Sequence, residues 1–270
     1  MQWKGTAVVT GAGSGIGRAL TRAFAERGLS VAALDIDGER AAETAALIDP
    51  RGGRTLPLQC DVASRESVAA AGRRIRDWRG DVTVVCNNAG VALRRRGTHA
   101  AMADWQWVVG VNLWGVIHGI HEFLPDLLGS PDGGHIVNTA SILGLVPSGV
   151  SALYSATKYG VVGLSESLRS ELAGTGVGVS VLCPGVVSTT IFASERVRPD
   201  ALRTATSADE LPPTRTYDFS PPLEPDAVAA LVLEGIDEDR LFIFTDPRTE
   251  QMVDAHHREV MRDFAPVRPA

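Results

Sequence analysis

Along most of the chain, short apolar runs alternate with longer stretches in which apolar residues recur every three or four positions. The second pattern is typical of a helix with one buried face: between residues 15 and 27, Ile16, Leu20 and Phe24 are spaced by four. The apolar runs predict strands at residues 6–10, 31–34, 56–60, 82–86, 135–141, 177–182 and 241–244. The longer stretches predict helices at residues 15–27, 38–47, 64–78, 102–128, 152–172, 226–235 and 248–264, of which 102–128 is long enough to bend.

This alternation of strands and helices predicts βαβ units, and therefore a parallel sheet. The strand runs are nearly all apolar, as expected where helices cover both faces of the sheet. We therefore expect residues 1–270 to form a single α/β domain, a doubly wound, Rossmann-like parallel sheet in three layers (α/β/α). In such folds a ligand binds beyond the carboxyl ends of the strands, so the residues that follow each strand are the candidates for a site.

Residues 188–225 break this pattern, because they are irregular and hold six prolines. A loop of this length within a compact domain is usually functional or disordered. Since it begins at the carboxyl edge of the sheet, we interpret it as a lid over the substrate; a merely disordered insertion is the alternative. Residues 265–270 are predicted to form a disordered tail.

Charge excludes one large class of function. Lys and Arg number 26 and Asp and Glu number 32, which gives a formal net charge of −6, so the chain lacks the basic footprint of a nucleic-acid-binding protein. The one basic run, Arg-Arg-Arg at residues 94–96, is short and is expected to be a solvated loop.

Three cysteines, Cys60, Cys86 and Cys183, lie far apart and form no CxxC pair. Neither a disulfide framework nor metal-ligand spacing is therefore present, and a reduced, intracellular protein fits best. No apolar run reaches the roughly 20 residues that a membrane span needs, and the first residues enter a strand pattern at once, which leaves no room for a signal peptide. We expect a cytoplasmic protein whose partner is a small molecule, not a nucleic acid or a membrane.

A glycine-rich turn at residues 10–17, Thr-Gly-Ala-Gly-Ser-Gly-Ile-Gly, joins the first predicted strand to the first predicted helix. Glycines permit a tight turn, and a helix N-terminus presents N–H groups and a positive dipole end to phosphates. The spacing is GxxxGxG, on Gly11, Gly15 and Gly17, rather than GxGxxG. The turn predicts a dinucleotide site; glycines used only for strand–helix packing are the alternative.

Asp35, at the end of the second predicted strand, favours NAD(H) as the dinucleotide. A carboxylate about 20 residues beyond the glycines can accept hydrogen bonds from the adenosine ribose, and it would repel the 2′-phosphate of NADP. Ile36 and Asp37 follow, where NADP would require Arg or Lys nearby. The alternative for Asp35 is a helix-capping or turn residue, because Asp37-Gly38 is itself a turn signal.

Further motifs follow the glycine turn in a fixed order. They are Asp61-Val62, Asn-Asn-Ala-Gly at residues 87–90, Asn112, Ser141, Tyr154-x-x-x-Lys158, and Pro184-Gly185 through Thr189. In order and spacing this series resembles the single-domain branch of the short-chain dehydrogenase/reductase family over nearly the whole chain. One YxxxK is common by chance, whereas the complete series in this order is specific.

The resemblance implies an oxidoreductase with a dinucleotide site. Asp61 would hydrogen-bond to the adenine, and residues 87–90 would form a wall near the ribose of the adenosine. Val187 and Thr189 would hold the nicotinamide carboxamide. A packing role alone for residues 87–90 is the alternative. The cofactor-binding residues implied are Gly11, Ser14, Gly15, Ile16, Gly17, Asp35, Asp61, Val62, Asn88, Ala89, Gly90, Tyr154, Lys158, Pro184, Gly185, Val187 and Thr189.

Hydride transfer between a nicotinamide and an alcohol also requires a proton donor or acceptor beside the substrate oxygen. We predict that Tyr154 is this group, because Lys158 lies four residues later on the same helical face and a nearby cation favours the phenolate. Ser141 would orient the substrate oxygen. In the family that the chain resembles, an Asn at the position of Asn112 helps to hold a relay water; helix packing is the alternative.

The predicted function is NAD-dependent oxidation of a secondary alcohol or reduction of a ketone, with a hydrophobic substrate. The rivals are a non-catalytic NAD-binding regulator and an epimerase or dehydratase that recycles its nicotinamide. The predicted substrate residues are Ser141, Leu143, Tyr154 and Ile191. The predicted apolar wall consists of Leu93, Ile142, Leu143, Leu145, Val150, Ile191 and Phe192.

Two further features complete the sequence-based expectations. His118, His121 and Glu122 resemble a metal-binding helix only loosely, because HExxH is absent, so no metal is expected. The resemblance also implies a homodimer or homotetramer formed through the predicted helices 102–128 and 152–172.

Overall fold

The computed structural model describes residues 4–93, 95–147, 151–204 and 221–264. Seven parallel strands form one sheet, as the sequence predicts, and their order is β3-β2-β1-β4-β5-β6-β7. The strands are β1 (Thr6–Thr10), β2 (Ser30–Asp35), β3 (Thr55–Gln59), β4 (Val82–Asn87), β5 (Gly134–Thr139), β6 (Val177–Cys183) and β7 (Phe242–Phe244). The order reverses between β1 and β4, which is the point where a doubly wound sheet opens a crevice for a ligand.

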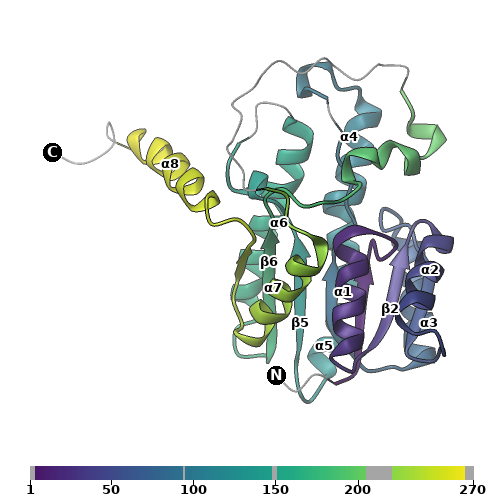
Figure 1. Ribbon diagram of the computed structural model, residues 1–270. Helices are drawn as coiled ribbons and strands as arrows, with labels where there is room; N and C mark the ends of the chain where they lie inside the picture. The colour runs from purple at the N-terminus through teal and green to yellow at the C-terminus, as the bar shows by residue number, and fades with distance from the viewer. Residues whose placement is uncertain (1–3, 94, 148–150, 205–220, 265–270) are drawn as a thin grey trace.

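Helices cover both faces of the sheet and make the fold a three-layer α/β/α sandwich (Figure 1). Successive side chains of a strand point to opposite faces, so Ala7 and Val9 join the core under α1 and α7, whereas Val8 joins the core under α3, α5 and α6. The helices are α1 (Gly15–Glu26), α2 (Gly38–Ile48), α3 (Arg65–Trp78), α4 (Met102–Val109), α5 (Gly115–Gly129), α6 (Ala152–Glu171), α7 (Pro225–Asp237) and α8 (Thr249–Arg262).

The helix predicted at residues 102–128 contains a local change of helical type. A π-helical turn, η2 (Gly110–Trp114), separates α4 from α5 without a break in the chain. A π turn adds a residue to one helical turn and therefore rotates the faces of the helices on its two sides. Asn112, a candidate site residue, lies within this turn and is fully buried.

The segment predicted to be irregular, residues 188–225, contains short helical turns. These are η4 (Ile191–Val197) and η5 (Asp200–Leu202), both 3₁₀-helical, and Val187 forms an isolated parallel bridge with Leu223. The prediction of irregular structure is therefore wrong for residues 191–202. Pro199 and a non-helical residue, Ala193, keep these turns short, which is why no periodic pattern marks them in the sequence. The rest of this segment, residues 205–220, and the predicted tail at 265–270 lie outside the described residues.

The last helix, α8, extends away from the body of the domain (Figure 1). Thr249 is its only fully buried residue, and its contact with α6 includes the pair Tyr159 Oη and His256 Nε2, 3.5 Å apart. Within the described part of the chain, no helix is both long and apolar enough to cross a membrane.

The core beneath α1 is expected to contribute much of the stability. Phe24 is fully buried between α1 and the sheet, so Phe24→Ala removes a large apolar side chain and leaves a cavity. We expect a loss of about 3–5 kcal/mol in the free energy of unfolding, measured by urea denaturation. Leu47→Ala on α2 is the control, because Leu47 is 69% exposed and should change stability by less than about 0.5 kcal/mol. Equal losses in the two variants would contradict this assignment of the core.

Candidate active site

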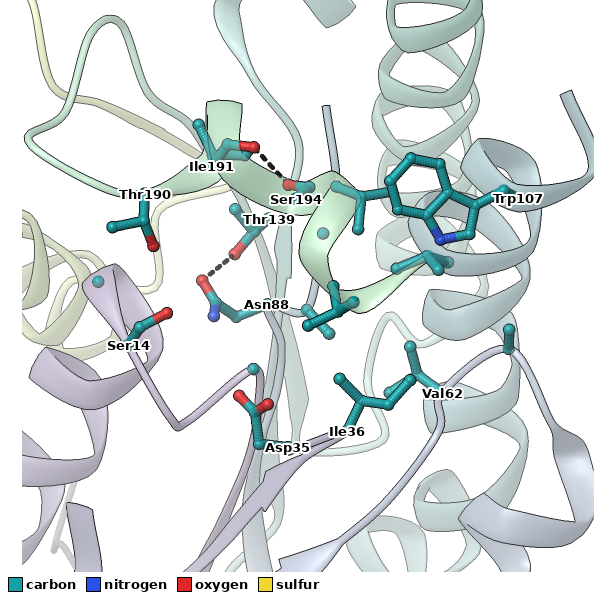
Figure 2. Close-up of a pocket in the computed structure, with 18 of the residues that line it drawn as sticks. Ser14, Asp35, Ile36, Val62, Asn88, Trp107, Thr139, Thr190, Ile191 and Ser194 are labelled. Carbon is teal, nitrogen blue, oxygen red and sulfur yellow. Dashed lines mark hydrogen bonds between the residues drawn. The ribbon is translucent and has the colours of Figure 1, made fainter. Parts of the chain in front are cut away.

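A cavity of about 280 Å³ lies at the carboxyl edge of the sheet, where the order of the strands reverses. Figure 2 shows Asp35 and Ile36 on one side of it and Ile191 and Ser194 of η4 on the opposite side. The sequence-predicted residues in its wall are Gly11, Ser14, Gly15, Ile16, Asp35, Asp61, Val62, Asn88, Ala89, Gly90, Tyr154, Lys158, Pro184, Thr189 and Ile191. Residues from five strand ends are thus brought together as one site.

The glycine turn connects β1 to α1 at one end of this cavity. Gly15 has a φ of +51°, in the left-handed region, and a side chain there would also approach Thr189. At Gly17, an added Cβ would overlap the carbonyl oxygen of Gly11. Gly17 therefore lets the chain pack against itself behind the turn and does not line the cavity, whereas Gly11 and Gly15 do.

Asp35 stands at the end of β2 with its carboxylate fixed by main-chain groups. Oδ2 accepts a hydrogen bond from the N–H of Gly13 (2.8 Å), and Oδ1 accepts one from the N–H of Asp37 (3.0 Å). Helix capping belongs to a different residue, because Asp37 caps α2 by accepting a hydrogen bond from the N–H of Arg40. The bond from the N–H of Asp37 to Asp35 Oδ1, two residues apart, is that of a turn, so the turn alternative for Asp35 is met beside its place in the wall. Asp35 is thus held at the cavity wall, where a ribose diol would fit a carboxylate.

The Asn-Asn-Ala-Gly sequence after β4 is attached to the end of β1. The N–H groups of Asn88 and Ala89 both donate to Thr10 Oγ1, at 2.9 and 3.0 Å, and Asn88 Nδ2 donates to the Thr10 carbonyl oxygen. Asn87 turns the other way, and its Nδ2 donates to Asn138 Oδ1 on β5. These bonds agree with a packing role. Asn88, Ala89 and Gly90 also line the cavity, so they are candidates for contact with a ligand as well.

Tyr154 and Lys158 lie on one face of α6, as their spacing predicts. Lys158 Nζ is 5.5 Å from the centre of the Tyr154 ring and donates a hydrogen bond to the carbonyl oxygen of Thr139 (2.7 Å). Ser141 hydrogen-bonds to Tyr154. It was expected to end a strand, but β5 ends at Thr139, and Ser141 instead caps a 3₁₀ turn, η3 (Ile142–Gly144).

Burial controls the titration of both groups. It raises the pKa of Tyr154 to about 12, and the hydrogen bond with Ser141 opposes this rise. The direction is opposite to the lowering expected from a nearby cation alone. Burial also lowers the pKa of Lys158 to about 8, while the neighbouring Cys183 thiol acts in the opposite direction.

Asn112 uses its side chain to attach η2 to the loop after β4. Its Oδ1 accepts from the N–H of Val91 (2.8 Å), and its Nδ2 donates to the carbonyl oxygen of Val91 (2.9 Å) and to Thr157 Oγ1 (3.3 Å). These contacts match the packing alternative, and the relay role of Asn112 stays a prediction.

Some sequence-predicted residues lie outside the cavity wall. Ser141 lies behind the cavity wall, where it hydrogen-bonds to Tyr154. Val187 packs against the core beneath α1. Phe192 was expected in the apolar wall but is 69% exposed. Val150 lies outside the described residues. The other predicted residues that do not line the cavity are Gly185, Leu93, Ile142, Leu143 and Leu145.

The structure also adds residues that the sequence-based prediction missed. Ser151 caps α6 by accepting a hydrogen bond from the N–H of Tyr154, and it therefore sets where the catalytic turn of this helix begins. A serine just before a helical pattern is a recognisable signal for a cap. The apolar wall consists mainly of Ile36, Val91, Trp107, Val111, Val197 and Leu202.

The prediction that residues 94–96 form a solvated loop is wrong for Arg95. Its side chain is 2% exposed, and it forms an ion pair with Asp104 on α4, with Nη1 and Oδ2 2.7 Å apart. A buried arginine needs a buried acid as partner, and no local sequence pattern indicates a partner nine residues away.

Within the described ranges, no group of three His, Cys, Asp or Glu residues is arranged to hold a metal ion. His118 has another contact: its Nδ1 lies 2.8 Å from the carbonyl oxygen of Val62, next to the cavity.

Comparisons with known proteins agree with this geometry. The family model for short chain dehydrogenases matches residues 5–200. The chain belongs to the short-chain dehydrogenase family. It is 35% identical over 243 residues to the 1-deoxy-11-beta-hydroxypentalenate dehydrogenase of Streptomyces exfoliatus, which covers 89% of this chain and 82% of that protein.

Two other matches show how far the likeness to other short-chain dehydrogenases extends. Over 186 residues the chain is 39% identical to the probable oxidoreductase EphD of Mycobacterium tuberculosis, but this match covers 69% of the chain and only 31% of EphD. A short-chain dehydrogenase/reductase from Burkholderia phymatum, crystallised in complex with NAD, superposes with a TM-score of 0.91 at 35% identity and covers 100% of this chain and 99% of its own. The present chain thus has the dinucleotide-binding fold of this family, and it spans about a third of the length of EphD.

Burial of Lys158 predicts a pH dependence of stability in this short-chain dehydrogenase. Its pKa falls from an ordinary value of 10.5 in the unfolded chain to about 8 in the folded one. Between these two values the unfolded chain binds more protons, so stability should rise as the pH rises from 8 toward 10.5. Compared with Lys158→Met, the wild type should gain free energy of unfolding between about pH 7 and pH 9.5.

Urea denaturation across this pH range measures the effect. Tyr154 stays protonated in both states below its ordinary pKa of 10, so it does not contribute in this window. The control is Lys4→Met, since Lys4 is exposed and its variant should run parallel to the wild type. A Lys158→Met curve that also runs parallel to the wild type would show that burial of this ammonium group costs nothing.

Proposed function

We propose that this chain is an NAD(H)-dependent short-chain alcohol dehydrogenase or ketone reductase. The observation that carries the proposal is the convergence of Tyr154 and Lys158 at the cavity that Asp35 and the glycine turn also line, with Ser141 hydrogen-bonded to Tyr154 behind the wall. A proton-transfer group and a candidate ribose-binding carboxylate in one cavity are what an alcohol–nicotinamide hydride transfer requires.

NAD(H) is favoured over NADP(H) by the same wall. Asp35 would accept hydrogen bonds from the adenosine ribose, and its charge would repel a 2′-phosphate. Gly11 and Gly15 would allow a pyrophosphate to approach the main chain at the N-terminus of α1, and Asp61 and Val62, which line the cavity, would contact the adenine. The similar Burkholderia phymatum protein, crystallised with NAD, supports this assignment.

In the proposed mechanism, NAD(H) held by the glycine turn and Asp35 would supply or accept the hydride, and its oxidised form would add a positive charge to the site. Ser141 hydrogen-bonds to the substrate oxygen and holds it near Tyr154. The Tyr154 hydroxyl then donates a proton to a ketone oxygen, or accepts one from an alcohol. Pro184 and Thr189 line the cavity and would lie beside the nicotinamide, where Thr189 resembles a carboxamide-binding position; Val187, the other such position, packs against the core instead.

Lys158 makes this proton transfer feasible at neutral pH. Burial alone would keep Tyr154 protonated, so a charge is needed to stabilise its phenolate. With a pKa of about 8, Lys158 is still mostly cationic at pH 7, and the carbonyl oxygen of Thr139 holds its ammonium group below the phenol ring. Lys158 also has further N–H donors for the nicotinamide ribose.

The apolar side of the cavity favours a hydrophobic secondary alcohol or ketone. Trp107, Val111, Val197 and Leu202 offer no charge to a substrate. The similar protein from Streptomyces exfoliatus is named as the dehydrogenase of a hydroxylated compound, 1-deoxy-11-beta-hydroxypentalenate, and this supports a hydroxylated substrate here. A homodimer or homotetramer remains part of the proposal; the exposed small residues Ala156 and Gly163 on α6 would permit close approach of a second helix.

Tyr154→Phe should lower turnover at least about 10²-fold, because it removes the hydroxyl group that we propose exchanges a proton with the substrate. The measurement is NADH formation with the best substrate from a panel of cyclic and acyclic secondary alcohols. NADH binding, followed by fluorescence, should stay within about twofold of the wild type, since the ring remains in place.

The matched control is Tyr159→Phe on the same helix, which is 37% exposed and outside the cavity wall, and which should retain full turnover. Wild-type activity in Tyr154→Phe would refute the assigned chemistry. Wild-type protein that binds NADH but produces no net NADH from any alcohol, while it epimerises or dehydrates a substrate, would favour the recycling rival.

Asp35 should determine the choice of dinucleotide. The wild type is expected to have a kcat/KM at least about tenfold higher with NAD than with NADP, since like charges brought together cost several kcal/mol. Asp35→Asn keeps the shape and an oxygen that can accept from Gly13, and should lower this ratio about tenfold or more. Glu39→Gln, an exposed change nearby, should leave the ratio unchanged. A wild-type preference for NADP would contradict the role of Asp35.

A further inference from the structure

A buried cluster of three charges lies beside the cavity and is not used by the proposed chemistry. Asp104 on α4 is fully buried, and the side chains of Arg95 and Arg198 are each 2% exposed. Asp104 Oδ2 is 2.7 Å from Arg95 Nη1, and Asp104 Oδ1 is 2.6 Å from Arg198 Nη2. One carboxylate thus bridges two guanidinium groups that come from parts of the chain about a hundred residues apart.

The cluster attaches the segment of residues 190–204 to α4. Arg198 lies between η4 and η5, and its guanidinium carbon is 5.0 Å from the centre of the Trp107 ring on α4. Thr204 Oγ1 donates to Asp104 Oδ1 (3.3 Å) and accepts from Arg95 Nη1 (3.0 Å). We call residues 190–204 the docked segment.

The docked segment also forms one wall of the cavity. Its Ile191, Ser194 and Val197 line the cavity opposite Ile36 and Val62, as Figure 2 shows for Ile191 and Ser194. Ser194 Oγ accepts a hydrogen bond from the N–H of Ala92 (3.3 Å). Any movement of this segment away from α4 would therefore open the cavity on that side.

The charges are arranged so that the segment can leave at moderate cost. When it is docked, Arg95 and Arg198 both pair with Asp104. Arg198 Nη1 also lies 3.7 Å from Glu195 Oε1 within the segment, and Arg198 Nε is buried without a hydrogen-bond partner among the described residues. When it leaves, Arg198 regains water, while Asp104 and Arg95 remain as a neutral pair. A buried ion pair seldom adds much net stability, but it fixes which groups meet. Docking here is consequently specific and reversible.

We propose that Arg198 is a positioning residue that docks residues 190–204 over the bound dinucleotide, and that this docking sets the rate at which the dinucleotide leaves. This inference rests on the proposed function, because it requires NAD(H) to occupy the cavity. Opening of a wall, rather than chemistry, limits turnover in many enzymes that close over their ligands.

The test is the rate of NADH release, measured by stopped-flow fluorescence after NADH is displaced by excess NAD. Arg198→Met keeps an unbranched apolar side chain that can pack beside Trp107 but removes the charge and the ion pair with Asp104. We expect release to be at least about tenfold faster, since truncation of one partner of a buried charge pair acts mainly on dissociation rates. The melting temperature should change little, because the Arg95–Asp104 pair remains.

Two further variants separate docking from other effects. Arg203→Met removes an exposed ion pair with Asp200 in the same segment and should release NADH at the wild-type rate. Arg198→Lys keeps the positive charge but loses the planar guanidinium over Trp107, so its release should be faster than that of the wild type and slower than that of Arg198→Met. This milder change serves as the test if Arg198→Met does not fold.

The outcomes distinguish the two proposals. If the wild type binds NADH and both Arg198 variants release it at the wild-type rate, the docking role is wrong and the proposed function is untouched. If Arg203→Met releases NADH as fast as Arg198→Met, the effect is not specific to the buried cluster, and the docking role is again wrong. If the wild type binds neither NADH nor NADPH, the proposed function itself fails.

Discussion

The parallel pairing of β1, β4 and β5 is the constraint on which the site depends. Their ends are level because Asn87 pairs with Asn138 in the sheet, and Thr10 holds the N–H groups of Asn88 and Ala89. Main-chain groups that leave the sheet at this edge lose their ladder partners, and the side chains just beyond each strand replace them. The carbonyl oxygen of Thr139, for example, accepts from Lys158, so one strand end fixes the position of the cation.

The seven-stranded sheet, its helices and most of the cavity wall could be predicted from the sequence, because each rests on a local signal. The apolar runs show which stretches are covered on both faces, and the residues after each run then share one edge. The 3₁₀ turns in residues 191–202 carry no such signal, since short turns interrupted by prolines have no period. The π turn at Asn112 could not be predicted either, because one additional residue in a helix leaves its apolar pattern almost intact.

Contacts between distant charges were the main feature that the sequence could not reveal. An arginine in an Arg-Arg-Arg run is most simply a solvated residue, and only the fold brings Arg95 and Arg198 to Asp104. The pKa of Asp104 lies below its ordinary value: burial alone would raise it, but hydrogen bonds from Arg95 and Arg198 outweigh burial. Lys158 shows the opposite balance: it is a buried cation with no carboxylate partner among the described residues, and its pKa is lowered. Burial is therefore compatible with two outcomes. The carboxylate in the cluster beside the cavity stays ionised, whereas the ammonium group inside the cavity can titrate.

The two main-chain hydrogen bonds to Asp35 have a consequence for affinity. Because the N–H groups of Gly13 and Asp37 each hold one carboxylate oxygen, the side chain has lost its rotational freedom before any ligand arrives. A ribose that binds there does not have to order this carboxylate, and the entropy of ordering it has already been lost during folding. The absence of a side chain at Gly13 makes this possible, since a Cβ there would lie 2.8 Å from Asp35 Oδ2. Preorganisation of the acceptor is therefore encoded in a glycine that is not one of the three in the GxxxGxG spacing.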